Sequence, residues 1–73
     1  MATETLDCKG MKCPQPVLKT QIKASSMKKG DTLIVLADCD TFPKDIKDWC
    51  AKTGKVLISI VDEGKVHKAT VQF

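Results

Sequence analysis

The stretch Thr32–Ala37 reads TLIVLA, and the polar triplet Asp38-Cys39-Asp40 follows it directly. A nearly continuous apolar run of this length, rich in branched side chains, is typical of a strand in the middle of a sheet. The polar triplet breaks the run. We therefore expect a central strand over residues 32–37, and the rest of the fold can be built outward from it.

On the N-terminal side of this strand, the sequence predicts a short strand followed by a helix. Leu6 and Cys8 alternate with polar neighbours, which indicates a first strand ending at Gly10. Beyond it, apolar residues fit one face of a helix that Lys28-Lys29-Gly30 closes. These residues are Val17, Leu18, Ile22, Ala24 and Met27.

On the C-terminal side, the pattern predicts a second helix and a hairpin. Residues 42–53 carry apolar side chains at helical spacing, with Pro43 in the first turn and Gly54 past the end. Two alternating segments follow, Val56 to Ile60 and Val66 to Phe73, and the residues Asp62-Glu63-Gly64 between them form a turn.

The predicted element order is β-α-β-α-β-β in a single domain spanning residues 1–73. Helices between the early strands and a terminal hairpin favour a mixed four-stranded sheet with both helices packed on one face. The fold class is therefore α/β (α+β), a two-layer sandwich whose strand order stays open. A chain of 73 residues with 42% hydrophobic and 29% charged residues is an ordinary small globular domain.

The charge pattern argues against direct binding of nucleic acid. All twelve basic residues are lysines, and the chain lacks the arginines that recognise bases and phosphates in a bidentate way. No apolar run reaches the length of a membrane span, and the start MATETLDCKG lacks the features of a signal peptide. We expect a cytoplasmic protein with no membrane association, whose four cysteines are thiols rather than a disulfide framework.

The segment GMKCPQPV, residues 10–17, places two prolines around the start of the first helix. If the helix begins at Pro14, both Pro14 and Pro16 lie in the first turn, where proline costs little, and Cys13 is the N-cap residue. The helix macrodipole then favours the thiolate and lowers the pKa of Cys13. Pro16 has no N–H, so the Gln15 N–H is the expected local donor to the Cys13 sulfur.

No second catalytic group accompanies Cys13 in the sequence. The single histidine, His67, lies in the last strand, and there is no Ser/His/Asp constellation and no glycine-rich phosphate loop. The chain therefore looks equipped to hold a group on sulfur rather than to process a substrate alone.

The other three cysteines have weaker functional readings. Cys8 either forms a disulfide with Cys13 or is a small buried residue, and Cys50 lies on the apolar face of the second helix. Cys39 stands between two aspartates that oppose thiolate formation, so no catalytic role is assigned to it. The spacing lacks paired C-x2-C units, which disfavours a metal site.

The segment LDCKGMKCPQPVL, residues 6–18, resembles the LDxxGLxCPxPxL signature of the TusA/SirA family of small sulfur-carrier proteins, and the likeness extends over the whole chain. Met11 stands where the family commonly has Leu. The resemblance implies a βαβαββ sandwich similar to the C-terminal domain of the third bacterial translation initiation factor. It also implies that Cys13 accepts a sulfane sulfur as a persulfide and passes it to a partner protein, in tRNA thiolation, sulfur oxidation or related trafficking.

On this reading the catalytic residue is Cys13, shaped by its neighbours Gly10, Pro14, Gln15 and Pro16. Cys8 is an auxiliary thiol, and Met11 and Lys12 dock partners. The expected partners are a sulfur donor, such as a cysteine desulfurase or a rhodanese, and a sulfur-acceptor protein; we expect a monomer without cofactor or metal. Two alternatives stay open, namely a thiol redox module using Cys8 and Cys13, and a regulatory domain that binds partners without chemistry.

Overall fold

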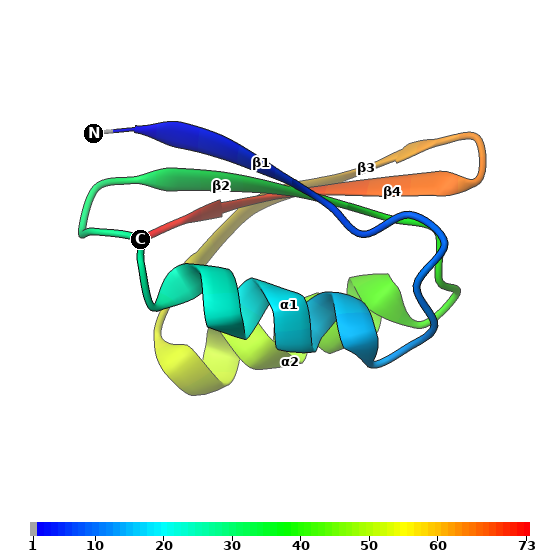
Figure 1. Cartoon of the computed structure of the whole chain (residues 1–73), viewed down its shortest axis with the longest axis horizontal. Coiled ribbons are helices and arrows are strands. Elements are labelled where there is room, and N and C mark those ends of the chain that lie inside the picture. Colours follow the sequence, from blue (N-terminus) through cyan, green and yellow to red (C-terminus); the bar gives the residue numbers. More distant parts are fainter. Residues whose placement is uncertain (1) are drawn as a thin grey trace.

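The computed structural model describes residues 2–73 of the chain. A four-stranded sheet forms one layer and two helices on one of its faces form the other (Figure 1). The elements are β1 (Thr3–Asp7), α1 (Gln15–Ala24), β2 (Thr32–Ala37), α2 (Phe42–Thr53), β3 (Val56–Glu63) and β4 (Val66–Gln72). The predicted α/β two-layer sandwich with βαβαββ order is confirmed.

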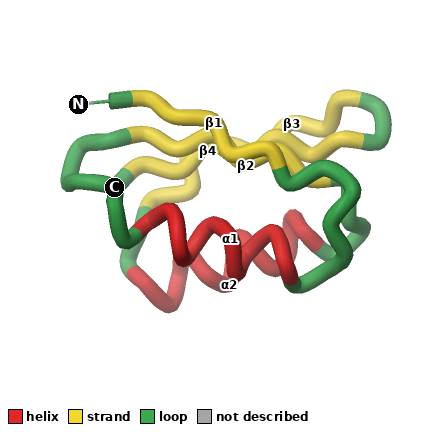
Figure 2. The backbone as a smooth tube through the Cα atoms, in the orientation of Figure 1, coloured by secondary structure: helices red, strands yellow, loops and turns green. Residues whose placement is uncertain are grey.

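The strand order is β1-β2-β4-β3, so β2 and β4 are the inner strands of the sheet. β1 pairs with β2 in parallel, in register from Thr3 with Thr32 to Asp7 with Leu36. The pairs β2–β4 and β3–β4 are antiparallel. The sheet is therefore mixed, β2 is the central strand that its apolar run predicts, and α1 is the crossover between the parallel strands (Figure 2).

The core lies between the inner face of the sheet and the two helices. Along β2 the side chains of Leu33, Val35 and Ala37 are fully buried, and those between them are half-buried on the open face. Burying a leucine or valine side chain stabilises the fold by about 1.5–3 kcal/mol relative to leaving it exposed. The other buried apolar residues are Cys8, Phe42, Ile46, Trp49, Cys50, Ala69 and Val71.

Helix α2 has the bounds that the sequence predicts. Phe42 and Ile46 are fully buried, and Gly54 follows the last turn with a φ of 76°, a left-handed conformation that glycine adopts readily. The Thr53 hydroxyl donates a hydrogen bond of 2.8 Å to the Trp49 carbonyl in the same last turn. The second helix is therefore specified by its local sequence.

The predicted apolar face of α1 is confirmed only in part: Val17 and Ala24 pack against the core, but Leu18 and Ile22 do not. Pro16 and Thr20 are buried, whereas Leu18 and Ile22, expected in the core, are 54% and 66% exposed. The Thr20 hydroxyl donates to the Pro16 carbonyl at 2.8 Å. Because this hydrogen bond satisfies the hydroxyl within the helix, a threonine can pack in the core, and the helix is rotated relative to the prediction.

The last hairpin departs from the predicted alternation in β3. Leu57 packs against the core, whereas Val56 and Ile58 are exposed, and a register irregularity between Leu57 and Ser59 then brings Ile60 to the core side. A bulge inserts an extra residue and so changes which side chains face inward. β3 also runs through Glu63, so the turn begins later than predicted.

Candidate functional site

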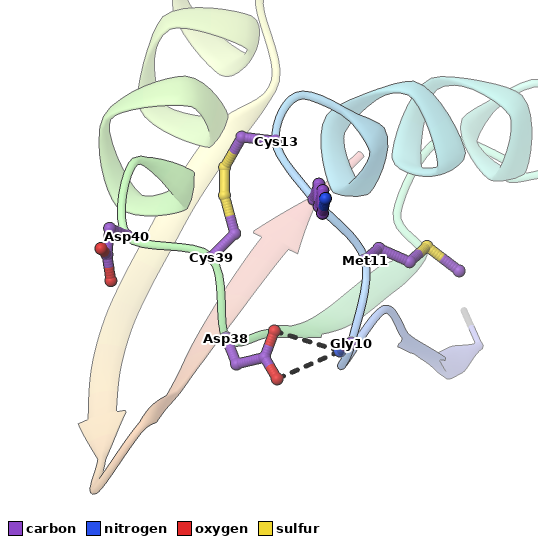
Figure 3. Close-up of a pocket in the computed structure, with 7 residues that line it drawn as sticks. Gly10, Met11, Cys13, Asp38, Cys39 and Asp40 are labelled. Atoms are coloured by element: carbon purple, nitrogen blue, oxygen red, sulfur yellow. Dashed lines mark hydrogen bonds between the residues drawn. A yellow bond between two sulfur atoms is a disulfide. The ribbon is translucent and has the colours of Figure 1, made fainter.

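Two loops meet at one edge of the sheet because β1 and β2 are parallel neighbours and both run toward that edge (Figure 1). The loop after β1 carries Cys13 and leads into α1, and the loop after β2 carries Cys39 and leads into α2. Together they line an open pocket of about 350 Å³ (Figure 3). Its lining residues are Gly10, Met11, Lys12, Cys13, Asp38, Cys39 and Asp40.

A pair of hydrogen bonds joins the two loops at the base of the pocket. The Gly10 N–H lies 3.1 Å from each carboxylate oxygen of Asp38 (Figure 3). Gly10 has a φ of 84°, a conformation that a side chain disfavours. The next residue, Met11, donates its N–H to the Cys8 carbonyl at 3.2 Å and packs partly against the core. The loop that carries Cys13 is therefore held by Asp38 of the neighbouring loop and by the packing of Met11 against the core.

Cys13 and Cys39 are joined across the pocket by a disulfide (Figure 3). Their Cα atoms are 5.9 Å apart although 26 residues separate them in sequence. Both residues are half-buried, in contrast to the remaining cysteines. The site therefore contains a pair of sulfur atoms rather than the single thiol that the sequence predicts.

The local setting of Cys39 is the turn that begins α2. Its carbonyl accepts the Phe42 N–H at 3.1 Å, and its sulfur lies 3.7 Å from the Thr41 hydroxyl. That hydroxyl also donates to the Asp45 carboxylate at 3.0 Å. Cys39 therefore stands just before the N-terminus of α2, as Cys13 stands just before that of α1.

The start of α1 corrects two predictions about Cys13. The N-cap residue is Pro14, without a side-chain cap, so Cys13 lies one position further out than expected. The Gln15 N–H donates to the Lys12 carbonyl at 2.8 Å and is therefore not the donor to the Cys13 sulfur. The Cys13–Pro14 peptide bond is cis. Cys13 therefore does not cap the helix.

Cys8 and Cys50 are free thiols in the core. Burial raises the pKa of both thiols, and the neighbouring Asp7 raises that of Cys8 further against an opposing effect of Lys19. Of the two alternatives for Cys8, the structure has the buried residue and not a disulfide with Cys13, because Cys8 packs in the core and Cys39 lies beside Cys13. The packing interpretation of Cys8 and of Cys50 is confirmed.

The sequence alone does not point to Cys39. Its two flanking aspartates oppose thiolate formation, and the order of the strands stays open without the structure. Parallel neighbouring strands bring their carboxyl ends to one edge of the sheet, so the order β1-β2 would have placed residues after Ala37 beside those after Cys8. The signal was available only once that pairing was known.

The remaining predicted site residues have varied positions. Pro14, Gln15 and Lys12 are exposed, while Pro16 is buried. His67 is not part of the pocket lining; its Nδ1 lies 2.6 Å from Asp62 Oδ1 on the neighbouring strand. Within residues 2–73, no three His, Cys, Asp or Glu side chains are placed to hold a metal ion. Neither α1 nor α2 has the length and apolar content of a membrane-spanning helix.

Comparison with known proteins gives concordant results. The family model described as "Sulfurtransferase TusA" matches residues 4–73. A protein of Neisseria meningitidis serogroup A named "Putative sulfur carrier protein" is 39% identical over 72 residues, covering 99% of this chain and 97% of that protein. A Halobacterium salinarum protein with the same designation is 40% identical over 62 residues, covering 85% of this chain and 76% of that one.

The fold also matches a solved structure. The crystal structure of a SirA-like protein from Desulfitobacterium hafniense superimposes with a TM-score of 0.83 at 21% identity, covering 94% of this chain and 95% of that one. At this identity the match concerns the fold alone. Since the family model extends over nearly the whole chain, this protein belongs to the TusA sulfurtransferase family.

Proposed function

We propose that the chain is a sulfur carrier that accepts a sulfane sulfur as a persulfide on Cys13 and transfers it to a partner protein. The observation that carries the proposal is the place of Cys13, a half-exposed cysteine on an open pocket and within the CPxP segment. Homologous proteins named as sulfur carriers support the same class of function.

Loading requires a thiolate that attacks the outer sulfur of a donor persulfide. The Cys13 sulfur forms the new S–S bond, the donor leaves as its thiol, and the donor's sulfane sulfur stays bound to Cys13. The nearby N-terminus of α1 favours a negative charge on this sulfur, as does the exposed Lys12 ammonium in the pocket lining. The acceptor then attacks the outer sulfur and releases Cys13 as a thiolate.

The partners under this proposal are other proteins of the cytoplasm. A cysteine desulfurase or a rhodanese is the donor, and the acceptor belongs to tRNA thiolation, sulfur oxidation or a related pathway. The carrier acts as a monomer, because it must dock successive partners through the same surface. It uses no cofactor under this proposal. Lys12 is exposed at the pocket and suits an acidic partner, whereas Met11 contributes only its half-buried side chain.

The test is sulfur loading of the reduced chain. The protein is incubated with a cysteine desulfurase and cysteine, or with a rhodanese and thiosulfate, and its intact mass is measured under anaerobic conditions. We expect one added sulfur on the wild type and none on Cys13→Ser. Cys50→Ala is the matched control, because it removes a thiol outside the pocket and should load like the wild type. Equal loading of Cys13→Ser would overturn the assignment.

A further inference from the structure

We propose that Cys39 is a resolving thiol, which releases the sulfur carried on Cys13 as hydrogen sulfide and leaves a Cys13–Cys39 disulfide. This rests on the proposed loading of Cys13. It adds a reaction to the carrier, since the chain could discharge its sulfur without an acceptor protein.

The geometry brings the two sulfur atoms together within one chain. The Cα separation of 5.9 Å lies in the range that a disulfide requires, and the two residues belong to loops that the Gly10–Asp38 hydrogen bonds tie together. A thiol held this close reacts as if it were present at a very high concentration. Cys8 and Cys50 are buried in the core, so Cys39 is the partner thiol in the pocket.

The reaction balances without an external oxidant. The Cys39 sulfur attacks Cys13 Sγ, the Sγ–Sγ bond forms, and the bond between Cys13 Sγ and the sulfane sulfur breaks. The leaving sulfur takes the electron pair of that bond and, with the proton lost by Cys39 and the persulfide's own proton, becomes hydrogen sulfide. The sulfane sulfur is thus reduced by two electrons, and the two cysteine sulfurs are oxidised to the disulfide.

Release of sulfide by Cys39 and transfer to an acceptor protein begin with attack on different sulfur atoms of the Cys13 persulfide. Because Cys39 Sγ can bond directly to Cys13 Sγ, the inner sulfur of the persulfide is the atom within its reach. An acceptor protein entering from the open side of the pocket meets the outer sulfur instead. The two outcomes therefore compete for one loaded state, and a docked acceptor favours transfer.

The flanking carboxylates moderate the reaction. Asp38 and Asp40 stand on both sides of Cys39 in the pocket lining, and their negative charges oppose the thiolate that must attack. The N-terminus of α2 acts in the opposite direction, whereas the Thr41 hydroxyl, 3.7 Å from the sulfur, donates its proton to the Asp45 carboxylate. The balance of these charges sets the rate at which Cys39 attacks a persulfide on Cys13.

A dithiol reductant can convert the Cys13–Cys39 disulfide back to the two thiols, so that the chain can be loaded again. A reductant of this class attacks one sulfur of the Cys13–Cys39 bond, and its second thiol completes the exchange, which restores both cysteines as thiols. Until then Cys13 has no free thiol and cannot be loaded. The oxidised chain is therefore an unloaded, inactive form.

The experiment follows the fate of the loaded sulfur. The reduced chain is loaded with sodium tetrasulfide, freed of excess reagent under anaerobic conditions, and sampled over time for intact mass and for free sulfide. We expect the wild type to release one sulfide for each intramolecular disulfide formed. Cys39→Ser and Cys39→Ala should retain the added sulfur at least about tenfold longer. Cys50→Ala, which removes a thiol from the core, should behave like the wild type.

Each contrary outcome has a distinct meaning. If both Cys39 variants lose their sulfur as fast as the wild type, the resolving role is wrong while the carrier function stands. If peptide mapping of the wild type finds the added sulfur on Cys39, the sulfur has been passed on rather than released, and the resolving role is also wrong. If Cys39→Ser gains no sulfur at all, both proposals fail.

Discussion

The Gly10 N–H lies 3.1 Å from both carboxylate oxygens of Asp38, a residue 28 positions further along the chain. Gly10 belongs to the loop that presents Cys13, and Asp38 directly precedes Cys39. The hydrogen bonds therefore set the distance between the two loops of the pocket. The relative position of the two cysteines therefore depends on a carboxylate that forms no bond to either sulfur.

Replacing Asp38 should separate this structural effect from the effect of charge. Asp38→Ala removes the acceptor of the Gly10 N–H and should lower the free energy of unfolding by about 1 kcal/mol. Asp40→Ala removes the same charge from the other side of Cys39 without touching those hydrogen bonds. We expect Asp38→Ala to form the Cys13–Cys39 disulfide more slowly than Asp40→Ala when both are treated with diamide. Equal rates would show that the hydrogen bonds do not position the loops.

Gly10 itself can be tested against a second glycine of similar conformation. Gly10 and Gly64 have φ values of 84° and 69°, and a Cβ at either position would meet nothing within 4 Å. Alanine at each position should therefore lower the free energy of unfolding by about 1–2 kcal/mol, which is the cost of a left-handed backbone conformation for a residue with a Cβ. Urea denaturation measures this change. Because Gly64 lies in the β3–β4 turn, only Gly10→Ala should alter the rate at which Cys13 is alkylated. A change of the same size in both variants would contradict the local role of Gly10.

The four cysteines should divide into two reactive and two protected thiols. In the reduced native protein, Cys13 and Cys39 face the pocket, whereas burial raises the pKa of the Cys8 and Cys50 thiols. N-ethylmaleimide should label the first pair rapidly and the second pair only after denaturation. Peptide mapping by mass spectrometry identifies the labelled residues. Rapid labelling of Cys8 in the native state would contradict its place in the core.

Asp31 should make the stability depend on acidic pH. The Lys28 and Ala2 N–H groups donate to its carboxylate at 2.8 and 3.0 Å, and these hydrogen bonds hold its pKa below the ordinary 3.8. The lowered pKa means that the folded state binds the proton less tightly than the unfolded chain. The contribution to stability is therefore complete above pH 3.8 and is lost as the pH falls through the lower, folded-state pKa.

The variant Asp31→Asn provides the measurement. Urea denaturation should show the wild type more stable at neutral pH, with a difference that shrinks as the pH is lowered below 3.8. A difference that stays constant over this range would mean that the carboxylate charge does not contribute.

The local sequence was sufficient to predict those elements whose type and ends depend on residues close together in the chain. The run TLIVLA predicts β2 because a short series of branched apolar residues followed by turn residues is typical of a buried strand, and Pro43 and Gly54 mark the ends of α2. The CPxP segment also locates the start of α1 to within one residue. In each case the deciding residues are neighbours in the chain.

The errors arose where a contact with a distant element decided the outcome. Thr20 rather than Leu18 faces the core, because the sheet contacts that side of α1, and the bulge in β3 depends on its pairing with β4. Neither feature has a local signal, since periodicity describes an isolated element and does not say which face a neighbour will cover.

By itself the sequence determined the order of the elements, the limits of the second helix and the presence of a cysteine at the beginning of the first. Only the tertiary structure decided which sulfur lies beside Cys13. The physical reason is that β1 and β2 pair in parallel and end on the same side of the sheet, so the loops that follow them lie side by side and bring Cys39 to Cys13 across a sequence separation of 26. Cys8 is only five positions from Cys13, but its side chain packs in the core.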